Sequence, residues 1–252
     1  MSILVFKLQA PLSSWGDTAV GEYRPSYNYP GVSALVGLLG AALGLRREDE
    51  AAHAALRDHY GYAVGVQSSG SLLRDYHTAQ VPSQASLKKR PHASRRDELA
   101  TPRHSLNTIL STRDYRQDGA FLIAVQTDNC GPYPLEALRD ALLRPKFVLY
   151  LGRKACAPGA PLHPQIIDAT TAEQAFDGYL ARLTEEIGKH CGRSGAPLLE
   201  LPAPVERIAW GQGIDAGPAP DLTITRKDRP IRRKGWQFGD RIEHVALVRK
   251  EA

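Results

Sequence analysis

The sequence has no apolar run that is long enough to cross a membrane. Its longest run, Val32–Leu45, spans 14 residues, whereas a transmembrane helix needs about 20. The first residues also lack the basic region and the small-residue cleavage site of a secretory signal peptide. We therefore expect a cytoplasmic protein without a membrane partner.

Cysteine is scarce, and its spacing argues against the common metal sites. Cys130, Cys156 and Cys191 lie far apart, with no C-x-x-C pair and no histidine at the spacing of a zinc ligand. Isolated cysteines are typical of reduced thiols in a cytoplasm, where disulfides are rare. The sequence therefore predicts no metal site, and no cofactor is expected.

The motifs of the common enzyme classes are also missing. There is no G-x-x-x-x-G-K-[ST], no G-x-G-x-x-G after a strand, no H-E-x-x-H and no G-x-S-x-G. One histidine is a candidate for acid–base chemistry, because His77 lies on an expected strand beside Tyr76. Three roles stay open for His77. They are packing or hydrogen bonding, which is the commonest role of a lone histidine, contact with RNA, and catalysis of RNA cleavage.

Positive charge is modest in total but concentrated in two segments. The net charge is +5. Between Ser86 and Arg116, eight basic residues accompany three acidic ones, and between Arg226 and Lys234, six accompany one. Solvated loops are one explanation for such runs. The other is a polyanionic partner, because the neutralisation of phosphates releases condensed counterions.

The pattern of apolar residues predicts an α+β fold. A short apolar run at Ile3–Leu8 predicts a buried first strand, followed by a loop over 9–30. Helices are expected at 32–45, 48–60, 135–143 and 172–188. Strands are expected at 62–69, 72–80, 105–115, 120–127, 147–151, 222–225 and 242–248, with a turn at 117–119 and a Pro/Gly-rich linker over 192–220. This order suits a ferredoxin-like domain of the kind found in RNA-recognition modules.

Two segments interrupt the regular pattern. The helix expected at 32–45 carries Gly37, Gly40 and Gly44 on one nearly bare face, so we expect it to pack closely on the sheet. Direct contact with a ligand is the alternative, and the start of the helix could bind a phosphate. Val81–His104 is polar and basic and shows no apolar period. Segments of this length without core-facing residues are usually functional or disordered.

Aromatic residues are interleaved with basic ones at 74–77, 113–116 and 146–154. Single-stranded RNA is bound by such patterns, because its bases stack on rings and its phosphates pair with basic side chains. In the third segment we expect Tyr150 to end a strand and Gly152 to let the backbone approach a ligand closely, with Arg153 and Lys154 beside it. Core packing is the alternative role of Tyr150.

Four stretches together resemble a known family. They are L-x-A-P-L-S-S-W-G from Leu8, Y-P-G-V-S-A-L-V-G-L-L-G from Tyr29, L-R-D-Y-H-T from Leu73, and Y-L-G-R-K-A-C from Tyr150. In this order, they are similar to the Cas-five family of RAMP proteins of CRISPR systems, in the form found in type I-E Cascade.

The resemblance implies a ferredoxin-like (RRM/RAMP) domain over residues 1–165, with a protruding β-hairpin thumb at about 81–104. A helix, a linker and a small β-rich region would follow over 166–252. The implied function is that of a non-catalytic subunit that binds and caps the 5′ handle of the CRISPR RNA (crRNA). The implied partners are the backbone subunit (CasC) and the large subunit (CasA), with target DNA nearby. The residues expected at the RNA are Ser33, Tyr76, His77, Lys88, Lys89, Arg90, Arg103, Arg113, Tyr115, Lys146, Tyr150, Gly152, Arg153 and Lys154.

One residue departs from the family pattern. Relatives often carry a basic residue just before the serine of the first helix, whereas this chain has Val32 before Ser33. A phosphate contact there would rest on backbone N–H groups and the Ser33 hydroxyl alone.

Two other functions stay open. Some Cas-five relatives in type I-C systems cut their repeat RNA, so the alternative is a metal-independent, repeat-specific endoribonuclease that uses Tyr76, His77 and a lysine. A third is a scaffold whose basic patches meet acidic protein surfaces.

Overall fold

The structure is a computed structural model that describes residues 1–88, 93–194 and 202–248. Within these residues, a nine-stranded sheet has the order β10-β11-β9-β5-β7-β1-β8, and β3 and β6 pair with further parts of β7. Its strands are β1 (Ser2–Ser13), β3 (Tyr23–Arg24), β5 (Tyr60–Ser68), β6 (Ser71–Pro82), β7 (Leu106–Thr127), β8 (Gln165–Asp168), β9 (Arg207–Trp210), β10 (Leu222–Arg232) and β11 (Gln237–Leu247). A second, two-stranded sheet pairs β2 (Trp15–Gly16) with β4 (Ser26–Tyr27). The expected α+β class is confirmed.

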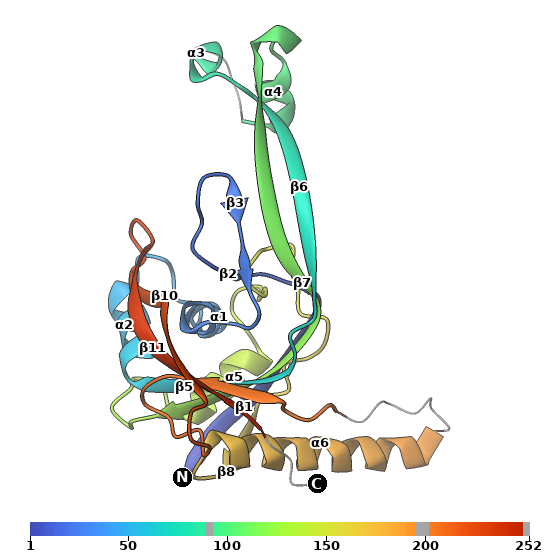
Figure 1. The fold of residues 1–252 in the computed structure, drawn as a ribbon, viewed down its shortest axis with the longest axis vertical. Helices are drawn as coiled ribbons and strands as arrows, with labels where there is room; N and C mark the ends of the chain where they lie inside the picture. Colours follow the sequence, from blue (N-terminus) through green and yellow to red (C-terminus); the bar gives the residue numbers. More distant parts are fainter. Residues whose placement is uncertain (89–92, 195–201, 249–252) are drawn as a thin grey trace.

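Helices cover both faces of the main sheet (Figure 1). One face packs against α1 (Val32–Leu43), α2 (Glu50–Asp58) and α5 (Leu135–Leu143), and the other packs against α6 (Ala172–Ser194). Strand β1 lies between these layers and is buried on both sides. Leu4 and Phe6 belong to the first core, while Ile3 and Val5 belong to the second. This double burial explains why its sequence is a continuous apolar run and not an alternating one.

Strand β7 differs from the prediction of two strands joined by a turn. It is one strand of 22 residues. Its first half pairs with β6 as far as Gln117, and its second half pairs with β5 from Ala120 onward. Asp118 has a φ of 56°, and a Cβ at Gly70 would lie 2.0 Å from the Gln117 carbonyl oxygen. The predicted turn at 117–119 was therefore wrong, because β7 continues through these residues in unbroken register with β1 while its other partner changes from β6 to β5.

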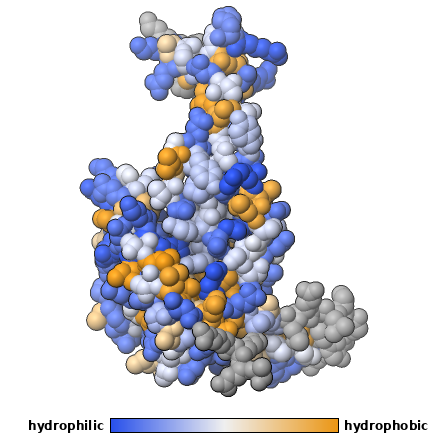
Figure 2. All heavy atoms as spheres, viewed as in Figure 1, coloured by the Kyte–Doolittle hydropathy of each residue, from blue (hydrophilic) through white to orange (hydrophobic). Residues whose placement is uncertain are grey.

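The arm, which we define as β6, the first half of β7 and the described residues between them (83–88 and 93–105), projects from the sheet (Figure 1). Two short helices, α3 (Gln84–Leu87) and α4 (Arg95–Leu99), and the 3-10 helix η1 (Arg103–Ser105) lie at its tip. Figure 2 shows apolar patches along the arm among hydrophilic atoms. These exposed apolar side chains include Leu72, Leu73, Ile109 and Leu110. The two strands thus extend beyond any core that could bury their side chains.

Several short elements were missed or misplaced by the sequence analysis. The loop expected over 9–30 contains the end of β1 and the strands β2, β3 and β4, and the linker expected over 192–220 contains β9. Strand β8 was also missed. All of these except the end of β1 have two to four residues, which is too short for an alternating pattern to be recognised. The main sheet includes strands from both sides of residue 165, and the division of the chain there stays a prediction.

The glycine-rich face of α1 has α2 as its close neighbour and not the sheet. A Cβ at Gly40 would lie 2.7 Å from the ring of His53 on α2. Gly44 ends the helix with a φ of +80°. At Gly37, by contrast, the nearest atom to an added Cβ is an Arg233 guanidinium nitrogen at 3.6 Å. Close packing therefore occurs at Gly40 and at Gly44, where a Cβ would lie 2.6 Å from the Lys146 side chain, whereas Gly37 leaves an open stretch of helix surface.

A buried charge cluster of Arg226, Asp228, Arg241 and Glu243 joins β10 to β11. Arg226 donates to Glu243 (3.1 Å), and Arg241 donates to Asp228 (2.5 Å) and to Glu243. Arg226, Asp228 and Glu243 are at most 4% exposed. Burial lowers the pKa of Arg226, but the neighbouring carboxylates outweigh it and leave that pKa raised. Removal of one partner from such a cluster leaves a buried charge uncompensated.

The same cluster attaches the β10–β11 hairpin to the start of α1. The Asp228 carboxylate accepts from the Val32 N–H (3.0 Å), and Glu243 accepts from the Tyr29 hydroxyl (2.7 Å). Burial and the Glu243 charge raise the pKa of Tyr29, so that its hydroxyl stays a donor. The Arg226 guanidinium also lies 3.9 Å from the ring centre of Tyr27.

We predict that Asp228→Ala lowers the free energy of unfolding by about 3–5 kcal/mol, because it leaves two buried arginines with one carboxylate. The control is Asp240→Ala on the same hairpin, where the aspartate is exposed and the expected change is within about 0.5 kcal/mol. Urea denaturation followed by circular dichroism measures both. Equal losses in the two variants would show that the cluster does not stabilise the fold.

Candidate nucleic-acid interface

Two adjoining cavities of about 710 and 180 Å³ form a groove beside α1. They share Ser33, Ala34, Gly152, Arg233 and Trp236. The walls of the groove are the first turns of α1, the loop that follows β1, the loop after α5 and the turn of the β10–β11 hairpin. Four chain segments that are far apart in sequence therefore meet at one site.

The loop after α5 is not the strand that was expected at 147–151. Its backbone N–H groups at Lys146 and Phe147 donate to the Ala42 and Ala41 carbonyls at the end of α1 (3.0 and 3.1 Å). Leu149 is buried in the core, whereas Tyr150 is 40% exposed and lines the groove. The prediction failed because these donors cap a helix and are not available to a sheet. Core packing of Tyr150 is not what the structure shows.

Gly152 lies beside the groove, but its close neighbour is the protein itself. It has a φ of +87°, and a Cβ there would lie 1.7 Å from the Ser14 carbonyl oxygen. The Ser14 N–H donates to the Leu151 carbonyl (3.0 Å). The glycine therefore makes room for the Ser14 backbone, and its contact with a ligand stays a prediction.

Arg153 and Tyr115 are brought together from distant predicted segments. The Arg153 guanidinium lies 4.5 Å from the centre of the Tyr115 ring, within the range of a cation–π contact. It also donates to the Arg24 carbonyl (3.1 Å). Arg153 thus connects the loop after α5 with β7 and β3 at the base of the arm.

The register of the arm separates the predicted residues Tyr76 and His77. His77 pairs with Ser111, and Tyr76 pairs with Thr112. Paired residues of an antiparallel ladder share a face, and successive residues alternate. His77, Arg113 and Tyr115 therefore lie on one face of the arm, which is continuous with Arg153.

Tyr76 lies on the opposite face of the arm, together with Arg74 and Asp114. The Asp114 carboxylate accepts from Arg74 (2.9 Å) and from the Tyr23 hydroxyl (2.5 Å). The hydrogen bond from Arg74 holds the pKa of Asp114 below its usual range. The Arg74 charge is therefore neutralised within the fold.

A further cavity of about 360 Å³ continues the groove along the arm. His77, Ile109 and Arg113 line it, together with Arg24. Arg24 also lines the larger cavity of the groove, so that the two cavities meet at this arginine. A path with basic side chains on its walls runs from the arm to α1.

The start of α1 is already occupied by a side chain. The Val32 N–H that could contact a phosphate donates instead to Asp228. Ser33 remains half-buried at the groove wall. One of the backbone N–H groups expected at a phosphate is therefore already bonded within the protein, and contact of Ser33 with a phosphate stays a prediction.

The remaining predicted residues lie away from the groove. Lys88 and Arg103 are exposed at the tip of the arm, and Lys154 is exposed beside the loop after α5. The aliphatic part of Lys146 covers Gly44 at the end of α1. Lys89 and Arg90 lie outside the described residues.

Sequence reasoning missed part of the groove wall. The groove residues that it did not predict are Arg24, Lys227, Arg232, Arg233, Trp236 and Phe238. A signal was present, because the basic run 226–234 is followed by two aromatic residues. Within that run, Arg226 is buried and paired, whereas Lys227, Arg232 and Arg233 border the groove.

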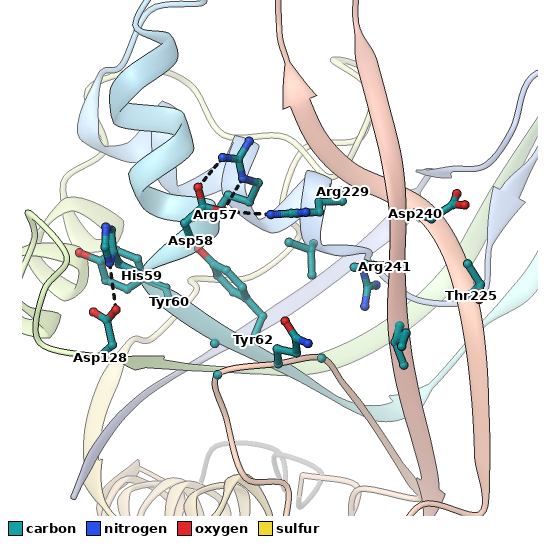
Figure 3. Close-up of a pocket in the computed structure, with 16 residues that line it drawn as sticks. Arg57, Asp58, His59, Tyr60, Tyr62, Asp128, Thr225, Arg229, Asp240 and Arg241 are labelled. Carbon is teal, nitrogen blue, oxygen red and sulfur yellow. Dashed lines mark hydrogen bonds and ion pairs between the residues drawn. The ribbon is translucent and has the colours of Figure 1, made fainter.

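A different pocket, of about 780 Å³, lies between α2 and the β10–β11 hairpin (Figure 3). None of the predicted RNA-binding residues lines it. Most of its charged groups are paired: His59 with Asp128 (2.9 Å), Arg57 and Arg229 with Asp58, and Arg241 with the buried Asp228 and Glu243. This pairing leaves little free charge for a ligand.

Two other kinds of site, a metal centre and a membrane-spanning helix, are absent from the described residues. These residues contain no group of three or more histidine, cysteine or acidic side chains that could hold a metal ion. Over the same ranges, no helix combines the length and the apolar character that a membrane crossing requires.

A family model described as "CRISPR-associated protein (Cas_Cas5)" matches residues 3–241. The chain therefore belongs to this family, as the sequence resemblance indicated. A curated relative is "CRISPR system Cascade subunit CasD" of Escherichia coli (strain K12). It is 30% identical over 186 residues, which are 71% of this chain and 77% of the relative.

Two solved structures have a similar fold. One is named "CRISPR RNA-guided surveillance complex", with a TM-score of 0.61, 23% identity, and coverage of 97% of this chain and 89% of that chain. The other is named "Crystal structure of Cas protein", with a TM-score of 0.56, 24% identity, and coverage of 97% and 94%.

We predict that Gly152→Ala destabilises the fold more than Gly235→Ala. Both glycines have a φ near +80°, which costs an L-residue roughly 1–2 kcal/mol. Gly235 has no atom within 4 Å of an added Cβ, whereas Gly152 has the Ser14 oxygen at 1.7 Å. Thermal unfolding measures the difference. A similar loss in both variants would mean that the Ser14 contact is not tight.

Proposed function

We propose that this chain is a non-catalytic subunit of a CRISPR surveillance complex that holds the guide RNA. The observation that carries the proposal is the path from His77 and Arg113 on the arm, past Arg24 and Arg153, to Trp236. It combines basic side chains with exposed rings, which is how proteins bind single-stranded RNA. The names of the Escherichia coli relative and of the first solved structure support the same conclusion.

We further propose that the bound segment is the 5′ handle of the crRNA, and that the arm is the thumb of a ferredoxin-like RAMP domain. The exposed apolar side chains of the arm and Lys88 at its tip are suited to contact with neighbouring subunits. The backbone subunit (CasC) and the large subunit (CasA) are the proposed neighbours, with target DNA nearby.

The geometry does not favour the endoribonuclease alternative. Tyr76 and His77 lie on opposite faces of the arm, and no lysine lines the cavity that contains His77 among the described residues. A nuclease would need its acid and base to reach one scissile phosphate. Incubation with repeat RNA without metal should therefore give no cut product.

The direct test of the proposed function is a pull-down of the tagged chain from its native host. We expect a small RNA with a uniform 5′ end and other complex subunits to co-purify. Recovery of the chain without RNA, or with RNA of random ends, would contradict the proposal.

We predict that Arg113→Ala weakens binding of the co-purified RNA and lowers the slope of log K against log salt by about 0.7–1, because one phosphate contact is lost. Arg113 is exposed on the groove-facing side of the arm. The control is Arg144→Ala, since Arg144 is exposed after α5 and away from the groove. A salt titration by fluorescence anisotropy measures both slopes, and equal slopes for Arg113→Ala and wild type would place the phosphates elsewhere.

A further inference from the structure

The turn between β10 and β11 is held rigidly at the rim of the groove. The Glu50 carboxylate on α2 accepts from the backbone N–H groups of Arg233 and Lys234 (3.0 and 2.9 Å). Arg57 on the same helix donates to the Pro230 carbonyl (2.8 Å). These bonds between a helix and a hairpin turn fix the position of Trp236, which follows in the chain.

Trp236 is an exposed ring in a strained backbone position. It has a φ of 53°, a conformation uncommon for a bulky residue, and its N–H donates to the Arg233 carbonyl (3.1 Å). The Arg47 guanidinium lies 4.8 Å from the ring centre and covers part of it. The ring nevertheless stays 52% exposed and lines both cavities of the groove. Backbone strain of this kind persists only where the surroundings enforce it.

The smaller cavity beside Trp236 is suited to one flat group. Its volume is about 180 Å³, below the range of about 300–1,000 Å³ that is usual for drug-sized ligands. Tyr150 lines it from the loop after α5, and Gly37 contributes helix backbone without a side chain. The cavity is thus bounded by the aromatic residues Tyr150, Trp236 and the buried Trp15, and by a bare stretch of α1.

Arg233 supplies a donor at the same place. Its side chain is half-buried and lines both cavities, and its Nε has no hydrogen-bond partner. An unpaired buried donor is costly, and burial lowers the pKa of this guanidinium. A carbonyl or phosphate oxygen of a ligand would remove part of this cost after a small shift of the side chain.

We propose that Trp236, Tyr150 and Arg233 form a subsite for one unstacked nucleobase of single-stranded RNA. This inference rests on the proposed function and adds the place where a base is held. The base stacks on the exposed part of the Trp236 ring, with Tyr150 beside it. Arg233 donates to an oxygen of the base or of the adjacent phosphate. Arg24 and Arg153, for which no ion pair is found within the described residues, hold the RNA backbone beside this base.

Tryptophan fluorescence tests the stacking directly, because the other two tryptophans are buried. Trp15 is 3% exposed and Trp210 is 8% exposed. The probe is the co-purified RNA, resynthesised and added to the full chain. We expect the RNA to protect the fluorescence from acrylamide quenching, and this protection to disappear in Trp236→Phe. Protection that persists in Trp236→Phe, or none in wild type, would overturn the subsite.

Binding measurements with abasic RNAs locate the base. Each RNA lacks one base, and Trp236→Ala should weaken binding of the intact RNA by about 5- to 150-fold. One abasic position should weaken wild-type binding similarly, and at that position Trp236→Ala should add little further loss. Phe147→Ala is the control, since Phe147 is 45% exposed on the same loop as Tyr150 but does not line the groove. If the loss from Trp236→Ala and the loss from the missing base are additive at every position, the subsite is contradicted.

The variant Gly37→Ala distinguishes an effect on RNA binding from an effect on the stability of the fold. The added methyl would lie 3.6 Å from the Arg233 guanidinium, which is ordinary contact, and alanine favours a helix over glycine. We expect an unchanged or higher melting temperature together with weaker binding of the intact RNA, and no effect on the critical abasic RNA. If Gly37→Ala and Trp236→Ala both bind the intact RNA with wild-type affinity, the subsite is overturned, whereas RNA binding by the chain is not contradicted. If no variant, wild type included, binds the RNA, the proposed function itself fails.

Discussion

The buried cluster of Arg226, Asp228, Arg241 and Glu243 is the interaction on which the groove depends. It satisfies four charges that would be costly to bury singly, and it does so only when β10, β11 and the start of α1 are in contact. Asp228 belongs to both parts, since it pairs with Arg241 and also accepts from the Val32 N–H. The wall that carries Arg233 and Trp236 is therefore held beside α1 by electrostatics as well as by packing.

The same cluster explains how the basic run 226–234 contributes both to the buried charge cluster and to the wall of the groove. Alternation along a strand turns successive side chains to opposite faces. Arg226 and Asp228 point inward and are buried, while Lys227 is exposed at the groove. The arm repeats this division, because Arg74 is neutralised by Asp114 whereas Arg113 is exposed. Only the unpaired cations are available to phosphates, so the formal charge of a segment overstates its capacity for RNA.

The groove is preorganised by backbone contacts. Leu151 accepts from the Ser14 N–H, the loop after α5 caps α1, and Glu50 holds the turn that precedes Trp236. Segments fixed in this way lose little conformational entropy when a ligand binds. Under the proposed function, a short RNA segment is held in one conformation by a protein that changes little. The exposed apolar side chains of the arm stand outside this rigid body, where contacts with other subunits would bury them.

Local patterns in the sequence were sufficient for the α+β class, for the helices α1, α2, α5 and α6, and for the buried strands, because burial imposes its period on the chain wherever an element is long enough. The family was also recognisable, since its motifs lie in short contiguous stretches such as Leu73–Thr78. Contacts between distant segments were not predictable. Asp118-Gly119 has the composition of a turn, and only the pairing partners of β7 keep it within a continuous strand. Gly152 correctly indicated a close approach, but the approaching atom belongs to Ser14. The meeting of Arg153 with Tyr115, and of Trp236 with Tyr150 and Gly37, joins residues that no local pattern relates. The sequence by itself therefore determined the elements and the family, while the tertiary structure decided which charges are buried, which remain free, and where the groove lies.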